Sequence, residues 1–207
     1  MVAISLAGTA NAETLTIAAF GDSLTQGFGL PADQGFVPQL QAWLDAAGAD
    51  AQLINAGVSG DTTQGGLSRI AWTLTDDVDA VIVTLGGNDL LRGLDPALSR
   101  ENLDGILSVI GEAGLPALLF SMTAPANYGQ DYKTAFDSMY ADLAEKHGAA
   151  LGGAFLEPIQ EAVAADPAKA LAELMQGDAI HPNADGVRQI VERHGPAVLR
   201  LIEAARG

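Results

Sequence analysis

Two polar blocks far apart in the sequence carry residue types that could form a catalytic triad. Ser23 lies in the block GDSL, directly after a short apolar run, and Asp178 and His181 lie three positions apart near the C-terminus. A serine hydroxyl is a weak nucleophile at neutral pH, so it needs a base, and the base needs a group that orients it. An aspartate three positions before a histidine in a tight turn can reach the imidazole Nδ1 and leave Nε2 free. This pattern predicts Ser23 as nucleophile, His181 as base and Asp178 as its support.

Each of these residues also has a simpler interpretation. Ser23, or the neighbouring Asp22, could serve only as the N-cap of a following helix, because both residue types accept hydrogen bonds from free backbone N–H groups. His181 could be a residue at a helix entry. The other two histidines are interpreted as structural. His147 precedes a glycine at a predicted helix end, where a cation suits the helix dipole, and His194 lies on an apolar helix face.

A tetrahedral intermediate in acyl transfer needs hydrogen-bond donors for its oxyanion. Three candidates are the backbone N–H of Ser23, the backbone N–H of Gly60 in the block NAGVSGDT, and the side-chain amide of Asn88 in the block GGND. Glycine-rich turns of this kind let the backbone approach a ligand closely, although GGND is also compatible with an ordinary turn. Asp61 and Asp89 are expected to brace these loops through hydrogen bonds to nearby backbone.

Alternating apolar runs and helical patterns predict the elements that hold these blocks. Strands are expected over residues 15–20, 51–56, 80–85, 116–122 and 149–155. Helices are expected over residues 36–47, 64–73, 97–112 and 132–146 and from residue 184 onward. Strands that alternate with helices predict an α/β fold of three layers, a doubly wound parallel five-stranded sheet with helices on both faces. Ligands bind beyond the carboxyl ends of such strands, and the blocks of Ser23, Gly60 and Asn88 follow the first three.

Composition limits the classes of function that are compatible with this chain. Its 207 residues are 48% hydrophobic and 17% charged, which predicts one domain with a sizeable core. A formal net charge of −16 disfavours nucleic acids and anionic lipid surfaces as partners. No apolar run reaches the ~18 residues of a membrane span, so stable membrane insertion is not expected. The absence of cysteine excludes a thiolate nucleophile and cysteine metal ligands.

The first residues, MVAISLAGTANA, are typical of the end of a secretory signal peptide. An apolar stretch precedes Ala10-Asn11-Ala12, which fits the small-residue pattern of a cleavage site. The basic segment that usually begins a signal is missing, so residues 1–12 are interpreted as a signal-peptide remnant and residues 13–207 as a single domain. This interpretation predicts a periplasmic or secreted protein, and the alternative is a floppy N-terminal leader.

With its four blocks in this order, the chain resembles the SGNH hydrolases, also called the GDSL esterase/lipase family. The four residues that name the family match Ser23 in FGDSLTQG, Gly60 in NAGVSGDT, Asn88 in GGND and His181 in DAIHPN. Asp178 matches the acid of the family's D-x-x-H motif. Within the family, the segments SGDTTQGGLSRI and APANYGQDYKTAFDSMYADLA are most similar to bacterial arylesterases and to multifunctional acyl-CoA thioesterase I, protease I and lysophospholipase enzymes.

The resemblance implies a flavodoxin-like fold and a broad ester-hydrolysing activity on aryl esters, thioesters and lysophospholipids, through an acyl-enzyme. It implies Ser23, His181 and Asp178 as the triad and Ser23, Gly60 and Asn88 as the oxyanion hole. No metal and no cofactor are expected. The expected partner is a small-molecule ester or thioester, and the expected state is a monomer.

The substrate pocket is predicted from apolar residues in two loops. Leu90, Leu91 and Leu94 follow Asn88, and Pro125 and Tyr128 lie in the block TAPANYG. Together they could line a shallow apolar groove for the acyl group, and such a groove favours short- to medium-chain esters. The alternative is that the leucines belong to the core or to the start of the next helix.

Two functions of other classes are compatible with parts of the pattern. A metal-dependent phosphoesterase could use Asp22, Asn88, Asp89 and His181, but dinuclear sites usually need several histidine and aspartate ligands. A nucleotide-binding P-loop requires a glycine-rich stretch that ends in a lysine, whereas the first lysine of this chain is Lys133. The second function is therefore a module that binds a nucleotide or a flavin in the loop after the first strand without a P-loop, and a flavin would colour the protein yellow.

Overall fold

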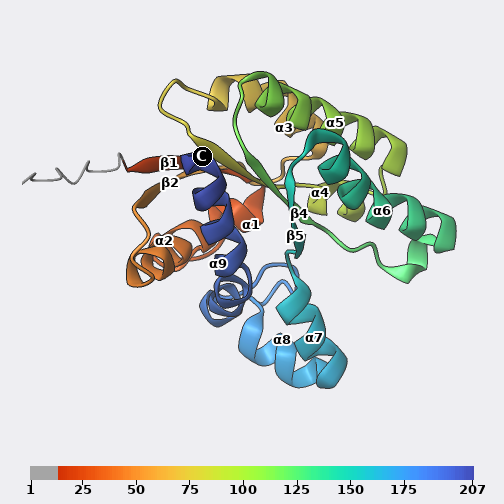
Figure 1. The fold of residues 1–207 in the computed structure, drawn as a ribbon. Coiled ribbons are helices and arrows are strands. Elements are labelled where there is room, and N and C mark those ends of the chain that lie inside the picture. Colours follow the sequence, from red (N-terminus) through yellow and green to blue (C-terminus); the bar gives the residue numbers. More distant parts are fainter. Residues whose placement is uncertain (1–13) are drawn as a thin grey trace, which may run out of the picture.

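The structure, a computed structural model, describes residues 14–207 (Figure 1). The expected signal-peptide remnant therefore lies outside the described residues. The described chain contains a five-stranded sheet in which all neighbouring strands are parallel, in the order β2-β1-β3-β4-β5. The strands are β1 (Leu15–Gly21), β2 (Ala51–Gly57), β3 (Ala80–Thr84), β4 (Ala117–Ser121) and β5 (Ala150–Ala154). This order is the flavodoxin-like one, and it confirms the predicted doubly wound α/β fold.

The central strands are apolar because helices cover both of their faces. All five residues of β3 are buried, and so are the last five residues of β1. A strand that is covered on both sides forms a continuous apolar run instead of an alternating pattern. The edge strand β2 differs, since it begins with buried and exposed residues in alternation. The burial pattern therefore follows the position of each strand in the sheet.

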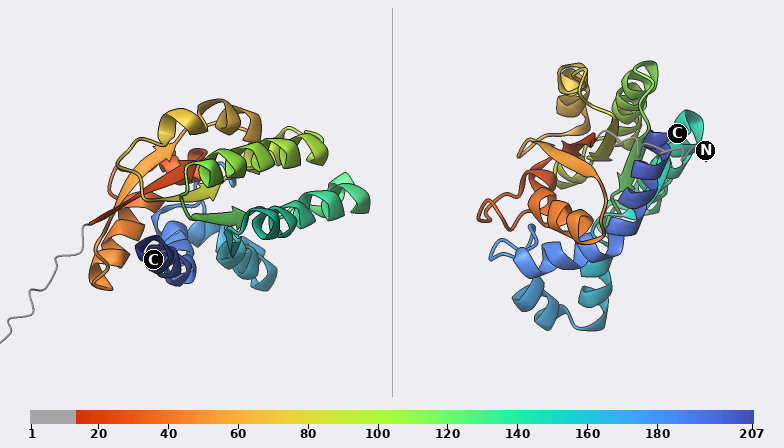
Figure 2. Two further views of the ribbon diagram at one scale, coloured as in Figure 1. Left: turned by 45° about the horizontal axis from the view of Figure 1, so that its top comes forward. Right: turned by 60° about the vertical axis from the view of Figure 1, so that its left-hand side comes forward.

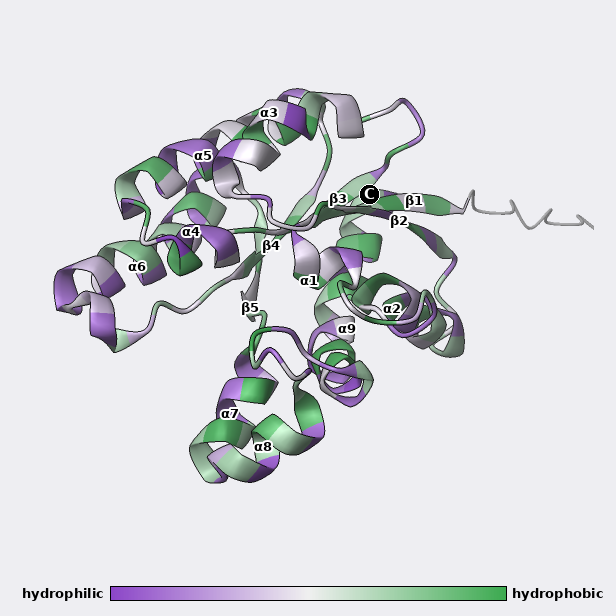
Figure 3. Cartoon of the chain, turned by 180° about the vertical axis from the view of Figure 1, so that it is seen from behind, coloured by the Kyte–Doolittle hydropathy of each residue, from purple (hydrophilic) through white to green (hydrophobic). Residues whose placement is uncertain are grey.

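Two helical layers enclose the sheet (Figures 1 and 3). Helices α3, α5 and α6 pack side by side on one face, and α2 and α9 pack together on the other. The longer helices are α2 (Phe36–Ala46), α3 (Thr63–Thr73), α5 (Pro96–Glu112), α6 (Gln130–His147) and α9 (Ala184–Arg206). The hydrophobic strands, green in Figure 3, lie between these layers. All five longer helices were predicted from the sequence, α2 and α9 from their apolar spacing.

Of the shorter helices, only the one after Asp22 is suggested by the sequence, as the alternative in which Ser23 or Asp22 is an N-cap. The shorter helices are α1 (Ser23–Gln26), α4 (Gly87–Leu91), the 3-10 helix η1 (Ala126–Tyr128), α7 (Glu157–Ala165) and α8 (Pro167–Leu174). Helices α7 and α8 pack against each other and against α9, and they project beyond the sheet (Figures 1 and 2). Each has a proline in its first turn, which favours a helix start. The two helices are only 9 and 8 residues long, which is too short for a clear apolar period.

A membrane-spanning helix is not found within residues 14–207, where no helix is both long enough and apolar enough to cross a bilayer.

Candidate active site

Ser23 begins the short helix α1 at the carboxyl end of β1. The N-cap of this helix is Asp22, whose Oδ1 accepts a hydrogen bond of 3.0 Å from the backbone N–H of Leu24. A β-carbon at Gly21 would lie only 2.7 Å from the carbonyl oxygen of Thr84, so glycine is required between β1 and β3 at this point. Asp22 therefore caps the helix, and the hydroxyl of Ser23 is left for another partner.

That partner is His181, which a tight loop near the C-terminus brings to the end of β1. The imidazole Nε2 of His181 lies 2.9 Å from Ser23 Oγ, and Nδ1 lies 2.6 Å from Asp178 Oδ2. The other carboxylate oxygen of Asp178 accepts hydrogen bonds from the backbone N–H groups of Ile180 and His181, at 2.9 and 3.0 Å. Ala179 between them has a φ of 54°, the left-handed region that favours glycine. The three predicted residues therefore form one continuous hydrogen-bonded chain.

The environment of Asp178 keeps its carboxyl ionised. Hydrogen bonds from the backbone and the side chain of His181, and from the backbone of Ile180, lower the pKa of Asp178 to about 2. A carboxylate at Nδ1 holds the Nδ1–H tautomer of the imidazole, which leaves the Nε2 lone pair directed at Ser23. The ring of Phe28 packs against the imidazole at a centroid distance of 4.8 Å. The histidine is thereby fixed by a charge on one side and an aromatic ring on another.

The three predicted oxyanion donors share one cleft. Ser23, Gly60, Asn88 and His181 all line it. Gly60 has a φ of 82°, so glycine is favoured in this turn. Asn88 lies in the first turn of α4, directly after the end of β3. The loops that follow β1, β2 and β3 thus converge on one edge of the sheet.

Asp22 connects the nucleophile turn to Asn88. Its Oδ2 accepts a hydrogen bond of 3.3 Å from Asn88 Nδ2, so one N–H of the amide is occupied and the other remains for a ligand. Asp22 is 1% exposed, and this burial raises the pKa of its carboxyl to about 6, against the hydrogen bonds from Leu24 and Asn88 that lower it. The sequence pattern suggests Asp22 only as a helix cap or metal ligand and does not reveal its contact with Asn88.

Asp61 and Asp89 brace the loops in a different way from the predicted one. Asp89 is buried and does not bond to its own loop. It accepts hydrogen bonds from the backbone and hydroxyl of Thr63, at 2.9 and 2.6 Å, and from the hydroxyl of Ser99 at 2.9 Å. Asp61 pairs with the side chain of Arg69 instead of with nearby backbone. Both carboxylates therefore join separate segments of the chain.

The remaining histidines lie apart from this cleft, as predicted. His194 is 2% exposed, and its Nε2 lies 3.1 Å from the carbonyl oxygen of Phe155. Burial lowers the pKa of His194. His147 lies 2.6 Å from a carboxylate oxygen of Asp104. Within residues 14–207, no group of three or more histidine, cysteine, aspartate or glutamate side chains is placed to hold a metal ion.

The cleft has a volume of about 760 Å³ and a mostly apolar lining. Of the five predicted groove residues, Leu90, Leu91, Pro125 and Tyr128 line it. Leu94 lies outside, because its backbone turns away to bond to Asp89 and Tyr132. The other large apolar lining residues were not predicted from the sequence, and they are Leu24, Phe28, Met122, Leu156 and Ile180. Two of them, Leu24 and Ile180, stand next to predicted triad residues, so their neighbours in sequence could have indicated them.

Comparison with known proteins places this geometry in a family. Residues 19–189 match the model of the GDSL-like Lipase/Acylhydrolase family. The chain belongs to this family. As a GDSL-family, or SGNH-family, protein it is a carboxylic ester hydrolase, and its activity is that of an esterase or acylhydrolase.

Relatives of this GDSL-family chain include named hydrolases. It is 34% identical to Esterase TesA of Pseudomonas aeruginosa over 195 residues, and this match covers 94% of this chain and 92% of that protein. It is 36% identical over 177 residues to Thioesterase 1/protease 1/lysophospholipase L1 of Escherichia coli, covering 85% of this chain and 78% of the relative. The solved structure of AlinE4, an SGNH-hydrolase family esterase, has a TM-score of 0.72 at 44% identity and covers 91% of this chain and 97% of AlinE4.

Burial of Asp22 makes the stability of the fold depend on pH. Its pKa is about 6 in the folded protein and 3.8 as a free group, so between these values the folded state holds a proton that the unfolded chain has released. The stability from this proton is present below pH 3.8 and is lost as the pH rises through 6. Asparagine cannot ionise, so the Asp22→Asn variant does not lose this stability. The unfolding free energy of the variant minus that of the wild type should therefore rise by about 2 to 3 kcal/mol between about pH 4 and pH 8. Urea unfolding of both proteins measures this, and a difference that stays constant with pH contradicts it.

Proposed function

We propose that this hydrolase is a serine esterase in which Ser23, His181 and Asp178 act as the triad. The observation that carries the proposal is the hydrogen-bonded chain from Asp178 Oδ2 through the imidazole to Ser23 Oγ, with steps of 2.6 and 2.9 Å. The 2.9 Å distance lies in the range for proton transfer between a nucleophile and its base, and the 2.6 Å distance is a hydrogen bond that orients the imidazole. The proposed partner is a small-molecule ester, and the enzyme works as a monomer.

In the proposed acylation step, Ser23 Oγ attacks the carbonyl carbon of the ester while Nε2 of His181 takes the hydroxyl proton. The carbonyl oxygen becomes an oxyanion that accepts hydrogen bonds from the backbone N–H groups of Ser23 and Gly60 and from the amide of Asn88. Asp178 stabilises the imidazolium that forms. The tetrahedral intermediate then collapses, and His181 gives its proton to the leaving alcohol.

Deacylation repeats these steps with water. His181 takes a proton from water, the hydroxide adds to the acyl-enzyme, and the second tetrahedral intermediate releases the carboxylic acid as Ser23 regains its proton. Each proton that leaves a nucleophile is returned to a leaving group, so the enzyme ends in its starting state.

The proposed substrates are short- to medium-chain carboxylic esters, including aryl esters, with thioesters and lysophospholipids as further candidates. The apolar cleft beside Ser23 supports an acyl chain as the bound group. The names of the relatives, esterase and thioesterase 1/protease 1/lysophospholipase L1, support the breadth of this set. The charge of −16 favours neutral esters over strongly anionic ones at the surface of the protein.

Replacing the nucleophile tests the mechanism directly. Ser23→Ala should lower kcat for p-nitrophenyl butyrate by at least about a thousandfold, because no oxygen remains to form the acyl-enzyme. A fluorophosphonate probe should label the wild type at the peptide that contains Ser23 and should not label the variant. Ser108→Ala, on helix α5, is the matched control and should keep wild-type turnover. Wild-type activity in Ser23→Ala would refute the proposed nucleophile.

The acyl preference is tested at Leu91, which lines the cleft and is 60% exposed. Each methylene that leaves water contributes about 0.8 kcal/mol, so a chain gains from Leu91 only if it is long enough to reach it. Leu91→Ala should therefore lower kcat/KM about three- to tenfold for an octanoate ester and leave that for an acetate ester nearly unchanged. Leu98→Ala, an exposed leucine outside the cleft, is the control. A wild-type optimum at long acyl chains would contradict the proposed preference.

We also propose that the protein is exported to the periplasm or beyond, with a mature chain that begins near Glu13. The support is the sequence Ala10-Asn11-Ala12 after an apolar stretch. Mass spectrometry of the protein from fractions of its own host should find a mature N-terminus near Glu13 in the periplasmic or extracellular fraction. An N-terminus at Met1 in that protein would contradict export by cleavage.

A further inference from the structure

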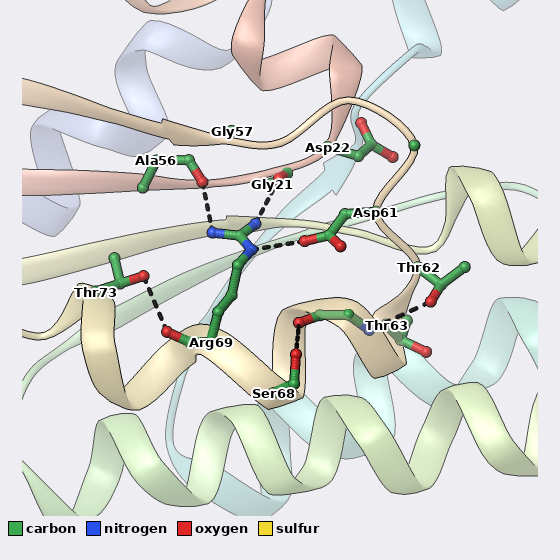
Figure 4. A network of polar contacts seen from close by, with 12 residues as sticks. Gly21, Asp22, Ala56, Gly57, Asp61, Thr62, Thr63, Ser68, Arg69 and Thr73 are labelled. Carbon is green, nitrogen blue, oxygen red and sulfur yellow. Dashed lines mark hydrogen bonds and ion pairs between the residues drawn. The ribbon is translucent and has the colours of Figure 1, made fainter.

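The side chain of Arg69 spans the ends of two strands that lead into the active site (Figure 4). Arg69 belongs to helix α3, and its guanidinium extends to the carboxyl ends of β1 and β2. Nη2 donates a hydrogen bond of 2.8 Å to the carbonyl oxygen of Gly21, and Nη1 donates one of 2.8 Å to that of Ala56. Nε donates to Asp61 Oδ2 at 2.6 Å. Each of the three nitrogen atoms of the guanidinium therefore donates a hydrogen bond to a different residue.

The three acceptors flank two of the proposed oxyanion donors. Gly21 lies two residues before Ser23, and Asp61 directly follows Gly60. Ala56 lies in β2, which leads into the loop of Gly60. One guanidinium thus connects the turn that carries the nucleophile to the loop that carries the second backbone donor.

The guanidinium is held in one orientation. Its central carbon lies 3.9 Å from the centroid of the Phe20 ring, and Phe20 is fully buried in β1. The side chains of Arg69 and Asp61 are only 21% and 14% exposed. The carbonyl oxygen of Gly21 also accepts a hydrogen bond of 3.0 Å from the N–H of Val58, which closes the same junction from the loop side. A stacked planar fork with three separate acceptors has a geometry that lysine cannot reproduce.

This junction matters for the reaction because two of the three oxyanion donors belong to the backbone. The amide of Asn88 can adjust through its side-chain torsions and has its own partner in Asp22. The N–H groups of Ser23 and Gly60 can move only with their segments, and a catalytic geometry must be held within ~0.5 Å. The loop of Gly60 is otherwise mostly exposed, and two further side chains hold it. Arg92 donates to the carbonyl oxygen of Gly60 at 2.8 Å, and Gln26 Oε1 accepts a hydrogen bond from Ser59 Oγ.

We propose that Arg69 is a positioning residue of the oxyanion hole, which fixes the spacing between the backbone N–H groups of Ser23 and Gly60. The inference rests on the proposed triad mechanism. Arg69 makes no contact with substrate in this role. Its loss weakens the stabilisation of the tetrahedral intermediate and leaves binding of the uncharged ester unchanged, so kcat falls while KM stays nearly constant.

Three variants test this inference. Arg69→Lys keeps the charge without the fork, and Arg69→Met removes both. Asp61→Asn removes the charge of the third acceptor, while its amide oxygen can still accept from Nε. With p-nitrophenyl butyrate, kcat should fall about 10- to 100-fold in both Arg69 variants and about three- to tenfold in Asp61→Asn, with KM within about twofold of the wild type. Arg100→Met is the matched control, because it breaks an arginine–aspartate pair with Asp142 that lies away from the cleft, and it should leave kcat unchanged.

A second readout separates positioning from a merely structural role. A short-chain trifluoromethyl ketone adds to Ser23 Oγ, the hydroxyl proton passes to His181, and the carbonyl oxygen becomes an oxyanion that imitates the tetrahedral intermediate. Its Ki should rise in the Arg69 variants by the same factor by which kcat/KM falls. Assays are made well below the unfolding temperature of each variant, and Asp61→Asn decides the question if the Arg69 variants do not fold.

Wild-type values of kcat and Ki in folded variants with a lowered unfolding temperature would show that Arg69 only stabilises the fold, and a rise in KM alone would place it in substrate binding. Either result overturns the inference. Failure of the triad mechanism has a different signature, because the wild type would then not form the ketone adduct and Ser23→Ala would remain active.

Discussion

Parallel pairing of the three strands β2, β1 and β3 is the constraint on which the active site depends. Because these strands run in the same direction, their carboxyl ends meet at one edge, where Gly21 pairs with Thr84 of the neighbouring strand. The loops that follow bring Ser23, Gly60 and Asn88 into one cleft although they are far apart in the sequence. The strand order reverses between β1 and β3, so the connections leave on opposite faces and open a crevice at that point. The position of the site is thus a property of the sheet, and the loops supply only its chemistry.

Buried carboxylates connect these loops, and the hydrogen bonds around each one decide how much its burial lowers the stability of the fold. Asp22 and Asp89 are both 1% exposed. Asp89 accepts three hydrogen bonds, from Thr63 and Ser99, which compensate for the water that it has lost. Asp22 accepts one from Leu24 and a longer one from the amide of Asn88, and burial outweighs them, so its pKa is raised to about 6. Asp22, which has fewer hydrogen bonds, is the carboxylate that contacts Asn88. This is consistent with an aspartate that orients the Asn88 amide and lowers the stability of the fold.

Features that depend on local composition could be predicted from the sequence, and features that depend on distant main-chain groups could not. The apolar strands and the glycine-rich blocks at their ends located Ser23, Gly60 and Asn88, because burial on both faces leaves a continuous apolar run. Helices α7 and α8 were missed because each is too short for a clear period. Leu94 shares the apolar character of Leu91, but the turn after α4 directs it elsewhere. Arg69 looks like an ordinary helix residue, since two of its three acceptors are carbonyl oxygens that no residue type reveals.

The triad itself divides into a local half and a long-range half. Asp178 and His181 meet within one turn, whose ends are joined by a bridge between Met175 and Pro182, so this pair needs little support from the sheet. The contact with the nucleophile is different, because it requires the whole turn to be docked against the segment after β1. The side chain of Gln176 makes that connection, since its Nε2 donates to the carbonyl oxygens of Phe28 and Pro182 at 2.8 and 3.0 Å. A change that weakened this docking would separate the base from the nucleophile while each remained correctly formed. The distance between them is therefore controlled by residues that take no part in the chemistry.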